Sequence, residues 1–514
     1  MRATWPLIAV ASLFALALPP GRVRAAGGLN RPEDPVVITG ASVPLLQGAA
    51  PSAVVAFAWN AGWQQVPVQV DERFTQNFSA IYDNTPPPFS STNINVLVYA
   101  DPNTFTGADP DPTLDADDEI AFMAKDAGDL APGGAQPAHT VPGSGERLTI
   151  TDPLPPGGTG YVYLFRQDGT LDPGAGQSYV SYAFNLLSGN YKTTYHLAGG
   201  PNAENSTVTT PFYSHHFSDR WVDDELRVTA GASTGVDILD RHKALFAPGN
   251  CVRSEDTFDN GDGSFPGEGA FIVNKVGPVR AIRAYIGANS GPNTERDHIF
   301  YAQRQDIRTY LRVHAIPSVM DFFDYSPAAT GMTYANDRNP AGVTIDGVPD
   351  SPAAGALQWE LVTGAQGSLV MAGQAITNIA GFAYTSYYED NATNPTTQCT
   401  GDADAYGSSG LWVNTSVPCT DPGLSCTSNL QAVRTVYYEP PGETASGAAA
   451  LASRATTPLS VGVSPFAVAS VGGIAVAATP AAAGGSATAW WALVMGVCAV
   501  AVAGALRARS RGRG

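Results

Sequence analysis

Residues 63–72 have the sequence WQQVPVQVDE, and the second half of this stretch decides the fold class. Apolar and polar residues alternate over residues 68–71, as they do in a strand with one buried face. Residues 95–99, NVLVY, and residues 119–123, EIAFM, are further short β-branched or aromatic runs. Such runs recur between clusters of Gly, Pro, Asn and Asp, while few stretches have a helical period. The pattern predicts an all-β fold.

The chain divides into β-rich regions of unequal length. Residues 29–165 contain enough short strands for a small N-terminal β-sandwich. Residues 179–440 contain longer runs, and at this length we expect a large two-sheet supersandwich. Residues 441–485 consist almost wholly of Ala, Gly, Ser, Thr, Pro and Val. That composition is typical of a flexible stalk.

The two ends of the chain predict export and anchoring. Residues 1–25 combine Arg2, an apolar run and small residues near the end, which is typical of a secretory signal peptide. Residues 487–506 are uncharged and long enough for a C-terminal transmembrane helix. The arginines in residues 507–514 favour a basic cytoplasmic tail. We therefore expect a protein on the cell surface or the outer side of the membrane, whose C-terminal helix is either retained or processed.

Composition excludes some classes of function. The formal net charge of −18 argues against nucleic-acid binding, because a binder needs a basic face to displace counterions. The sequence contains no nucleotide-binding loop, so we expect no nucleotide or organic cofactor. An even number of cysteines in the exported part predicts two disulfides of undetermined pairing rather than a zinc site. These cysteines are Cys251, Cys399, Cys419 and Cys426.

An acidic stretch at residues 109–119 predicts a metal site. Carboxylates this close repel one another unless a cation neutralises them, and Ca²⁺ accepts flexible sets of carboxylate oxygens. The spacing departs from the EF-hand pattern, and a solvated acidic turn is the alternative. The candidate ligands are Asp109, Asp111, Asp115, Asp117 and Glu119. A weaker candidate is the stretch DTFDNGDG at residues 256–263.

Several predicted strands of the larger region carry polar residues at alternate positions, which share one face of a strand. If these faces line a concave sheet, they would offer guanidinium groups for carboxylates and rings for sugars, hence an anionic glycan. For a lyase, a histidine or tyrosine would remove the C5 proton. The candidate catalytic residues are His216, His298, His314, Tyr285 and Tyr310. The candidate substrate-binding residues are Arg220, Trp221, Arg283, Arg296 and Arg312.

Two alternatives stay open for these residues. Polar outward faces are ordinary in antiparallel sheets, so the same pattern also fits a surface without a site. Asp321 and Asp324, in MDFFDYSP, are a candidate carboxylate pair for a glycosidase, and they equally fit a turn.

Three motifs resemble proteins of the galactose-mutarotase-like supersandwich fold. They are VPVQVDE at residues 66–72, DADDEIAF at residues 115–122 and GPVRAIRAYIG at residues 277–287. The resemblance implies a supersandwich body, a fold that serves carbohydrate epimerases, polysaccharide lyases and glycan-binding modules. It aligns no catalytic residue, and a shared fold does not establish a shared chemistry.

We therefore expect an exported, anchored surface protein that binds or processes carbohydrate. If it is an enzyme, it would be a polysaccharide lyase or a related carbohydrate-active enzyme. The rival hypothesis is a non-catalytic adhesive or structural surface protein, which the stalk, the anchor and the lack of a complete catalytic motif favour. The sequence indicates no oligomeric state.

Overall fold

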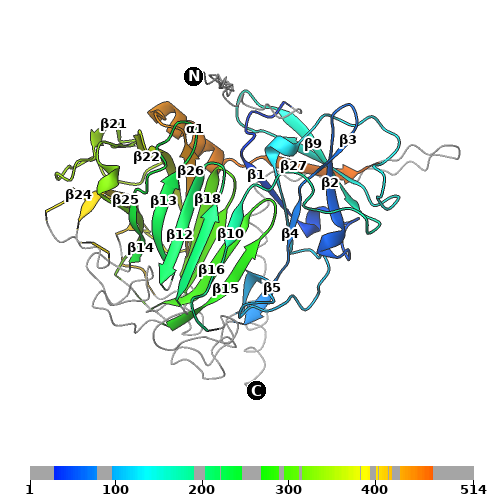
Figure 1. The fold of residues 1–514 in the computed structure, drawn as a ribbon, viewed down its shortest axis with the longest axis horizontal. Helices are drawn as coiled ribbons and strands as arrows, with labels where there is room; N and C mark the ends of the chain where they lie inside the picture. The colour runs from blue at the N-terminus through cyan, green and yellow to red at the C-terminus, as the bar shows by residue number, and fades with distance from the viewer. Residues whose placement is uncertain are drawn as a thin grey trace, which may run out of the picture. The chain divides into compact units, whose positions relative to one another are not determined.

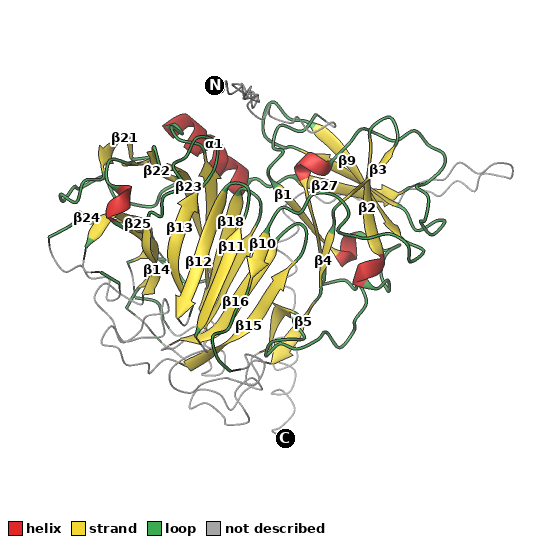
Figure 2. Cartoon of the chain, in the orientation of Figure 1, coloured by secondary structure: helices red, strands yellow, loops and turns green. Residues whose placement is uncertain are grey.

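The computed structural model describes thirteen segments of the chain, all within a unit that ends at Val468. These segments are residues 28–77, 95–189, 203–219, 221–245, 268–288, 294–311, 315, 317–382, 384–393, 401–402, 404–414, 416–418 and 429–466. In them the chain is built mostly from strands, with one α-helix (Figures 1 and 2). The expectation of an all-β fold is confirmed.

The first region contains three sheets of antiparallel strands. A five-stranded sheet has the order β27-β8-β9-β2-β3 and consists of Ser460–Pro465, Glu146–Thr151, Thr159–Arg166, Val54–Trp59 and Trp63–Val66. A three-stranded sheet has the order β1-β7-β4 and consists of Pro35–Thr39, Glu119–Met123 and Gln69–Asp71. β5 (Arg73–Asn77) pairs with β6 (Asn95–Tyr99). Three 3₁₀ turns accompany them: η1 (Gly40–Ser42), η2 (Pro51–Ala53) and η4 (Ala124–Asp126).

The five- and three-stranded sheets enclose one apolar core. Leu148 and Val162 of the larger sheet cluster with Ile38 and Phe122 of the smaller sheet. Strands with alternate apolar residues give this arrangement, because each sheet then has one apolar face to bury. The motif at residues 66–72 supplies β4, whose Asp71 is buried.

The larger region is organised around a nine-stranded sheet. Its strands, in the order β15-β16-β17-β18-β26-β23-β22-β20-β21, are Glu268–Val276, Ala281–Ala288, Thr294–Phe300, Arg304–Leu311, Leu430–Glu439, Gly367–Thr377, Glu360–Gly364, Thr333–Asn336 and Asn339–Thr344. Every pairing is antiparallel. The strand β26 comes after all the other strands of this sheet in the sequence, yet it lies in the middle of the sheet between β18 and β23.

Two four-stranded sheets cover one face of this sheet. The first, β10-β11-β12-β13, consists of Ser181–Ala183, Glu204–Thr209, Tyr213–Asp219 and Val222–Val228. The second, β14-β19-β25-β24, consists of Leu239–Leu245, Val319–Tyr325, Ala405–Val413 and Thr385–Asn391. The 3₁₀ turn η5 (Pro327–Ala329) follows β19.

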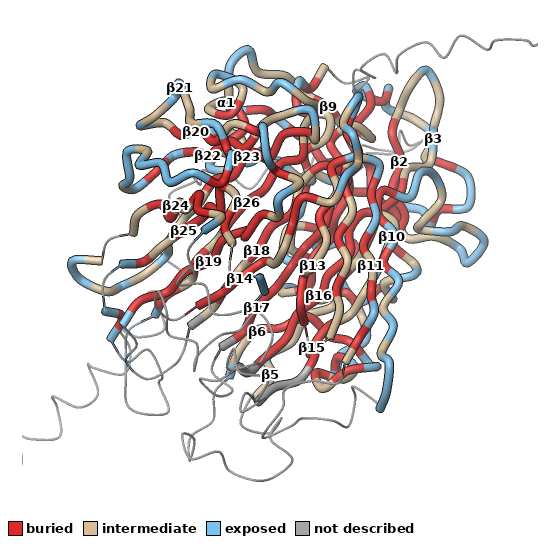
Figure 3. The backbone as a smooth tube through the Cα atoms, turned by 60° about the vertical axis from the view of Figure 1, so that its left-hand side comes forward, coloured by how far each residue is buried: buried red, intermediate tan, exposed pale blue. Residues whose placement is uncertain are grey.

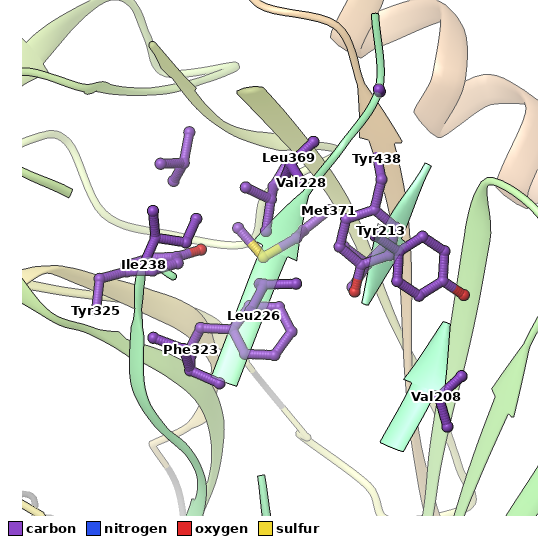
Figure 4. Close-up of a cluster of buried hydrophobic side chains, with 14 of the residues drawn as sticks. Val208, Tyr213, Leu226, Val228, Ile238, Phe323, Tyr325, Leu369, Met371 and Tyr438 are labelled. Carbon is purple, nitrogen blue, oxygen red and sulfur yellow. The ribbon is translucent and has the colours of Figure 1, made fainter. Parts of the chain in front are cut away.

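The core between these layers draws residues from all three sheets. Tyr213 of β12 stacks on Tyr438 of β26, with ring centroids 3.8 Å apart (Figure 4). Phe323 of β19 and Met371 of β23 belong to the same cluster. Buried residues run along β16, β17 and β18 (Figure 3). We call the face of the nine-stranded sheet that meets this core its inner face.

The helix α1 (Ala445–Thr456) packs on the opposite, outer face of the nine-stranded sheet (Figure 1). Its side chains Ala448 and Leu451 cluster with Val370 and Tyr437 of that sheet. After the helix, β27 pairs with β8 of the first region. The expectation of a flexible stalk is therefore wrong for residues 441–466. Alanine both favours helix and permits close packing, so a composition that resembles a linker here forms a packed element.

Several predictions lie outside the described residues. These are the signal peptide, the rest of the stalk, the transmembrane helix with its tail, and the four cysteines of the exported part. Among the residues that the structure describes, no helix has the length and apolar character needed to cross a membrane.

Candidate functional site

A row of basic side chains crosses the inner face of the nine-stranded sheet. The strand register places Arg283 of β16 opposite His298 of β17. Ile307 of β18 lies opposite both His298 and Arg434 of β26. All three basic residues are at most 2% exposed. Burying charged groups is costly unless partners compensate them, so the facing sheets must supply those partners.

Asp321 of β19 is the main partner. Its Oδ1 accepts a hydrogen bond from Nη1 of Arg434 at 2.5 Å and lies 2.8 Å from Nε2 of His242. Its Oδ2 lies 3.3 Å from Nη1 of Arg296. Two guanidinium groups and one imidazole therefore share a single buried carboxylate.

Asp223 of β13 connects His242 to a further histidine, His215. Its carboxylate lies 3.0 Å from Nδ1 of His215 and 3.7 Å from Nδ1 of His242. On the other side of His215, Nε2 lies 2.8 Å from the hydroxyl of Tyr438, which donates to Oε1 of Gln305 at 2.7 Å. Side chains of the covering sheets are thus linked to side chains of β18 and β26.

His298 closes the chain of contacts into a ring. Its Nδ1 lies 3.2 Å from Nε2 of Gln305, and its Nε2 accepts from Nε of Arg296 at 3.2 Å. Arg296 in turn contacts Asp321. We call this ring the interlayer network. Its members are His215, Asp223, His242, Asp321, Arg296, His298, Gln305 and Tyr438, with Arg434 attached at Asp321.

Arg283 has a partner of its own beside the network. Its Nη1 and Nη2 donate to the two carboxylate oxygens of Glu204 at 2.8 and 2.5 Å, a bidentate pair. Its Nη1 also donates to the hydroxyl of Tyr182 at 3.0 Å. The guanidinium carbon lies 3.8 Å from the ring centre of Phe217 and 4.1 Å from that of Trp221.

The network lowers the pKa values of two of its members, Asp321 and His298. Burial would raise the pKa of Asp321, but Arg296 and Arg434 hold it well below its usual range, so this carboxylate is ionised. Burial and the charge of Arg296 lower the pKa of His298 well below its usual range, so this imidazole is neutral. Both pKa values are thus lowered, and the network holds an ionised carboxylate beside a neutral imidazole. Perturbed pKa values within one enclosed site make it a candidate functional site.

Glu360 of β22 lies on the same inner face, opposite Met371 of β23. Burial raises its pKa to about 7, while its hydrogen bond with the hydroxyl of Tyr334 and the charge of Arg434 lower it. At neutral pH a substantial fraction of this carboxyl therefore carries a proton. Nη2 of Arg434 lies 3.0 Å from Sδ of Met371, so the network reaches the neighbourhood of Glu360.

A small cavity lies at this end of the network. Glu360 and Met371 line it, together with Trp359, Tyr384 and Leu411. Its volume is about 20 Å³, which is room for a water molecule. The arrangement combines a carboxyl group that is partly protonated near pH 7, two aromatic rings and a nearby guanidinium group.

Four of the sequence candidates do lie together on the inner face, namely Arg283, Tyr285, Arg296 and His298. They are at most 2% exposed, so the expectation of an open concave face is wrong for them. The physical reason is that the two four-stranded sheets cover this face and supply the opposite charges. Trp221 is buried as well, with its ring centre 4.3 Å from that of Tyr285.

The other candidates lie elsewhere. His216 of β12 is 29% exposed at its side chain and contacts Asp224 and Asn205, each at 2.6 Å. Tyr310 of β18 is partly buried, one residue out of phase with the inner-face residues of its strand. The remaining candidates, Arg220, Arg312 and His314, lie outside the described residues.

The acidic stretch separates into two parts. Asp115 and Asp117 lie with Asp118 in a group in which one carboxylate oxygen of each residue lies within 4.8 Å of the other two. Glu119 instead forms ion pairs at 2.7 Å with Arg73 and with Arg280. The weaker candidate at residues 256–263 lies outside the described residues.

Sequence reasoning missed much of the network. Asp223, His242, Arg434 and Glu360 carried no motif, and of the neighbouring histidines His216 was chosen rather than His215. One signal was available for His215, because Tyr213 and Phe217 at i±2 put it on an apolar, hence buried, strand face.

Comparisons with known proteins found no matching family and no matching curated protein. Among solved structures, a protein of glycosyl hydrolase family 38 from Enterococcus faecalis is similar with a TM-score of 0.39 and 9% identity, covering 86% of this chain and 47% of that one. An alpha-mannosidase from Enterococcus faecalis V583 has a TM-score of 0.37 and 8% identity, covering 86% and 45%. A protein named as an aldose 1-epimerase from Escherichia coli K12 has a TM-score of 0.25 and 12% identity, covering 51% and 100%. This chain thus spans about half the length of the two Enterococcus proteins.

Proposed function

We propose that this protein is an exported, C-terminally anchored surface protein that binds or processes carbohydrate, with an anionic polysaccharide as its ligand. The observation that carries the proposal is the convergence of Arg296 and Arg434 on one carboxylate, that of Asp321. A pair of guanidinium groups that holds a protein carboxylate is also suited to the carboxylate of a uronate. Trp359 and Tyr384, in the wall of the adjoining cavity, are rings of the kind that stack on sugar faces.

Processing would need a proton donor in addition to these binding groups. Glu360 is suited to that role, because its pKa of about 7 keeps a proton on the carboxyl near neutral pH. Asp321 stays ionised and would stabilise positive charge nearby. Binding without turnover would need the arginines and the rings alone.

The second candidate function is a non-catalytic adhesive or structural surface protein. The observation that favours it is the small volume of the cavity, about 20 Å³, which is far below that of a sugar ring site. In addition, the charges of the interlayer network compensate one another. On this reading the network holds the sheets together and Glu360 is a buried acid without a reaction.

A glycan array probed with the full-length chain tests the proposal. A parallel assay of acidic polysaccharides would follow the absorbance of unsaturated uronates. We expect Tyr384→Ala to weaken glycan binding about tenfold, which is about 1.4 kcal/mol, because it removes a ring from the cavity wall. The matched control is Tyr161→Ala, which removes a partly buried tyrosine of the first region.

The outcomes separate the two candidates. Binding that falls in Tyr384→Ala but persists in Tyr161→Ala supports the carbohydrate proposal and places the ligand at this cavity. Turnover that disappears in Glu360→Gln, while binding remains, assigns Glu360 as the acid. A folded wild-type chain that binds no glycan and cleaves no polysaccharide favours the structural alternative.

A further inference from the structure

The connector between β6 and β7, residues 100–118, gathers carboxylates from neighbouring positions. Three of them, Asp115, Asp117 and Asp118, each place a carboxylate oxygen within 4.8 Å of the others. Ca²⁺ binds oxygen at about 2.3–2.6 Å, so oxygens on opposite sides of one ion lie up to about 5 Å apart. The measured separations therefore suit three ligands of a single ion.

Two further carboxylates have an oxygen without a partner. Asp109 is 7% exposed, and its Oδ2 is buried without a hydrogen-bond partner, while its Oδ1 accepts from the backbone N–H of Asp111 at 2.8 Å. Oε1 of Glu72 is likewise buried without a partner. An unsatisfied buried oxygen is costly and rare in folded proteins, and on a carboxylate it points to a missing cation.

These unpartnered carboxylates lie close to the group of three. Oδ1 of Asp118 accepts a hydrogen bond from the backbone N–H of Arg73, the residue after Glu72, at 2.7 Å. Asp109 interacts electrostatically with Asp115, and Glu72 does so with Asp118 and Asp109. The carboxylates of Asp115 and Asp117 contact each other directly, with an oxygen of each within 4.8 Å of the other, and the backbone N–H of Asp117 donates to Oδ1 of Asp115 at 3.0 Å. Like charges in contact need a shared proton or a cation.

The nearby basic residues, Lys275 and Arg73, already have partners. Nζ of Lys275 lies 3.5 Å from Oδ1 of Asp71. Arg73 donates from Nη1 to Glu119 at 2.7 Å and from Nε to the backbone oxygen of Asp117 at 2.6 Å. The protein therefore supplies far less positive charge here than the carboxylates require.

We propose that the β6–β7 connector binds one calcium ion through Asp109, Asp115, Asp117 and Asp118, with Glu72 completing the set. The hard carboxylate oxygens, their number and the exposure of Asp115 and Asp117 to solvent suit Ca²⁺, which takes six to eight oxygen ligands. This inference is independent of the carbohydrate proposal, because it rests on other residues and another region.

A second acidic group shows the contrast. Asp240, Asp324 and Asp402 also bring carboxylate oxygens within 4.8 Å of one another. There, however, Nζ of Lys243 lies 2.5 Å from Asp324 and supplies a positive charge. In that group a lysine side chain therefore supplies the positive charge, whereas residues 100–118 of the connector include no lysine or arginine.

The bound ion would fix a connector that joins two parts of the described unit. Asp101 accepts a hydrogen bond from the backbone N–H of Asn274 in β15 at 2.8 Å. Thr106 donates to the backbone oxygen of Ile272 in the same strand at 2.5 Å. Calcium at residues 109–118 would hold these contacts in place by restricting the connector between them and β7.

Thermal unfolding of the full-length chain in EDTA and in excess CaCl₂ tests the site. We expect calcium to raise the Tm by on the order of 5 °C, because a ligand that binds only the folded state stabilises it. In Asp109→Asn/Asp117→Asn the calcium shift should disappear. In EDTA the same variant should unfold at or above the wild-type temperature, because it has lost repulsion. The matched control, Asp350→Asn, removes an exposed carboxylate between β21 and β22 and should keep the full shift.

Equilibrium dialysis with Ca²⁺ gives an independent measurement that does not depend on unfolding. One ion bound per wild-type chain, and a loss of at least about tenfold in affinity in the double variant, support the proposal. Equal Tm values of the wild type in EDTA and calcium, together with no bound ion, would overturn it. A calcium shift that survives in the double variant would overturn the assignment of these residues.

Discussion

The interlayer network and the β6–β7 connector are both rich in charged residues, but they differ in how far these charges are paired with charges of the opposite sign. In the network, Asp321 is surrounded by Arg296, Arg434 and His242, and each charge has a partner of the opposite sign. In the connector, Asp115 and Asp117 contact each other, and the oxygen Oδ2 of Asp109 has no partner.

This difference shows what charge-rich sequence stretches can and cannot tell. Charged residues on strands far apart in the sequence compensate one another once the sheets have packed. No local sequence motif predicts these pairs. Carboxylates at neighbouring positions of one loop stay close together and repel one another, so the sequence itself predicts that a cation is needed. An aspartate forms buried ion pairs between sheets in the network, whereas in the connector it is a candidate metal ligand.

The largest effect is expected when the shared carboxylate of the network is removed. Asp321→Ala leaves Arg296, Arg434 and His242 buried without their main partner, and should cost about 3–5 kcal/mol of unfolding free energy. Denaturant titration measures this loss. The control Asp224→Ala breaks the partly exposed pair with His216 and should cost at most about 1 kcal/mol. Similar losses of unfolding free energy in both variants would show that the buried network contributes no more to stability than the partly exposed pair.

The next effect is the pH dependence that Glu360 imposes. Its pKa is about 7 in the folded chain, against 4.5 for a glutamate that is freely exposed to water, so folding favours its protonated form. Its contribution to stability is complete below about pH 4.5 and is lost as the pH rises through 7, on the order of 3 kcal/mol. Glu360→Gln stays neutral, so its Tm should fall less between about pH 5 and pH 8 than that of the wild type. A parallel pH profile of the control Glu443→Gln should match the wild type, and an unchanged profile in Glu360→Gln would contradict the assignment.

A smaller effect is the coupling between Arg283 and Glu204. The variants Arg283→Met and Glu204→Gln each leave a buried group without its partner, so the double variant should lose less than the sum. We expect a coupling free energy of about 1–3 kcal/mol from a double-mutant cycle. The partly exposed pair Arg227 and Glu225, which are 2.6 Å apart, should give less than about 1 kcal/mol. A coupling as small in the buried pair would mean that solvent reaches it.

Local patterns predicted much of the fold. Alternation over residues 68–71 and the short apolar run at residues 119–123 predicted strands that the structure contains as β4 and β7. The composition of residues 441–466 suggested a linker, because the sequence does not show that Ala448 and Leu451 pack against a sheet far away in the chain. A stretch of small residues has no period strong enough to reveal such a partner.

The candidate site was predictable only in part. Arg283 and Tyr285 share one face of β16, and Arg296 and His298 share one face of β17, as alternate positions predict. Side chains at every second position of a strand point to the same side. That these faces lie under two further sheets could not be deduced, since it depends on pairings between strands far apart in sequence. Asp223 and Arg434 come from such strands, β13 and β26.

The smallest effect concerns salt, and it tests whether the connector is dominated by repulsion. In EDTA, raising NaCl from about 0.1 M to about 1 M shortens the Debye length from about 10 Å to about 3 Å, and so weakens repulsion between Asp115 and Asp117 at the surface. The calcium-free wild type should therefore gain up to about 1 kcal/mol in unfolding free energy. Salt also affects the rest of the protein, so the relevant quantity is the difference from Asp117→Asn, which should gain less. Because the network is buried, Asp321→Ala should respond to salt as the wild type does. An equal gain in Asp117→Asn and the wild type would show that repulsion in the connector is weak, and the contrast between the two regions would then fail.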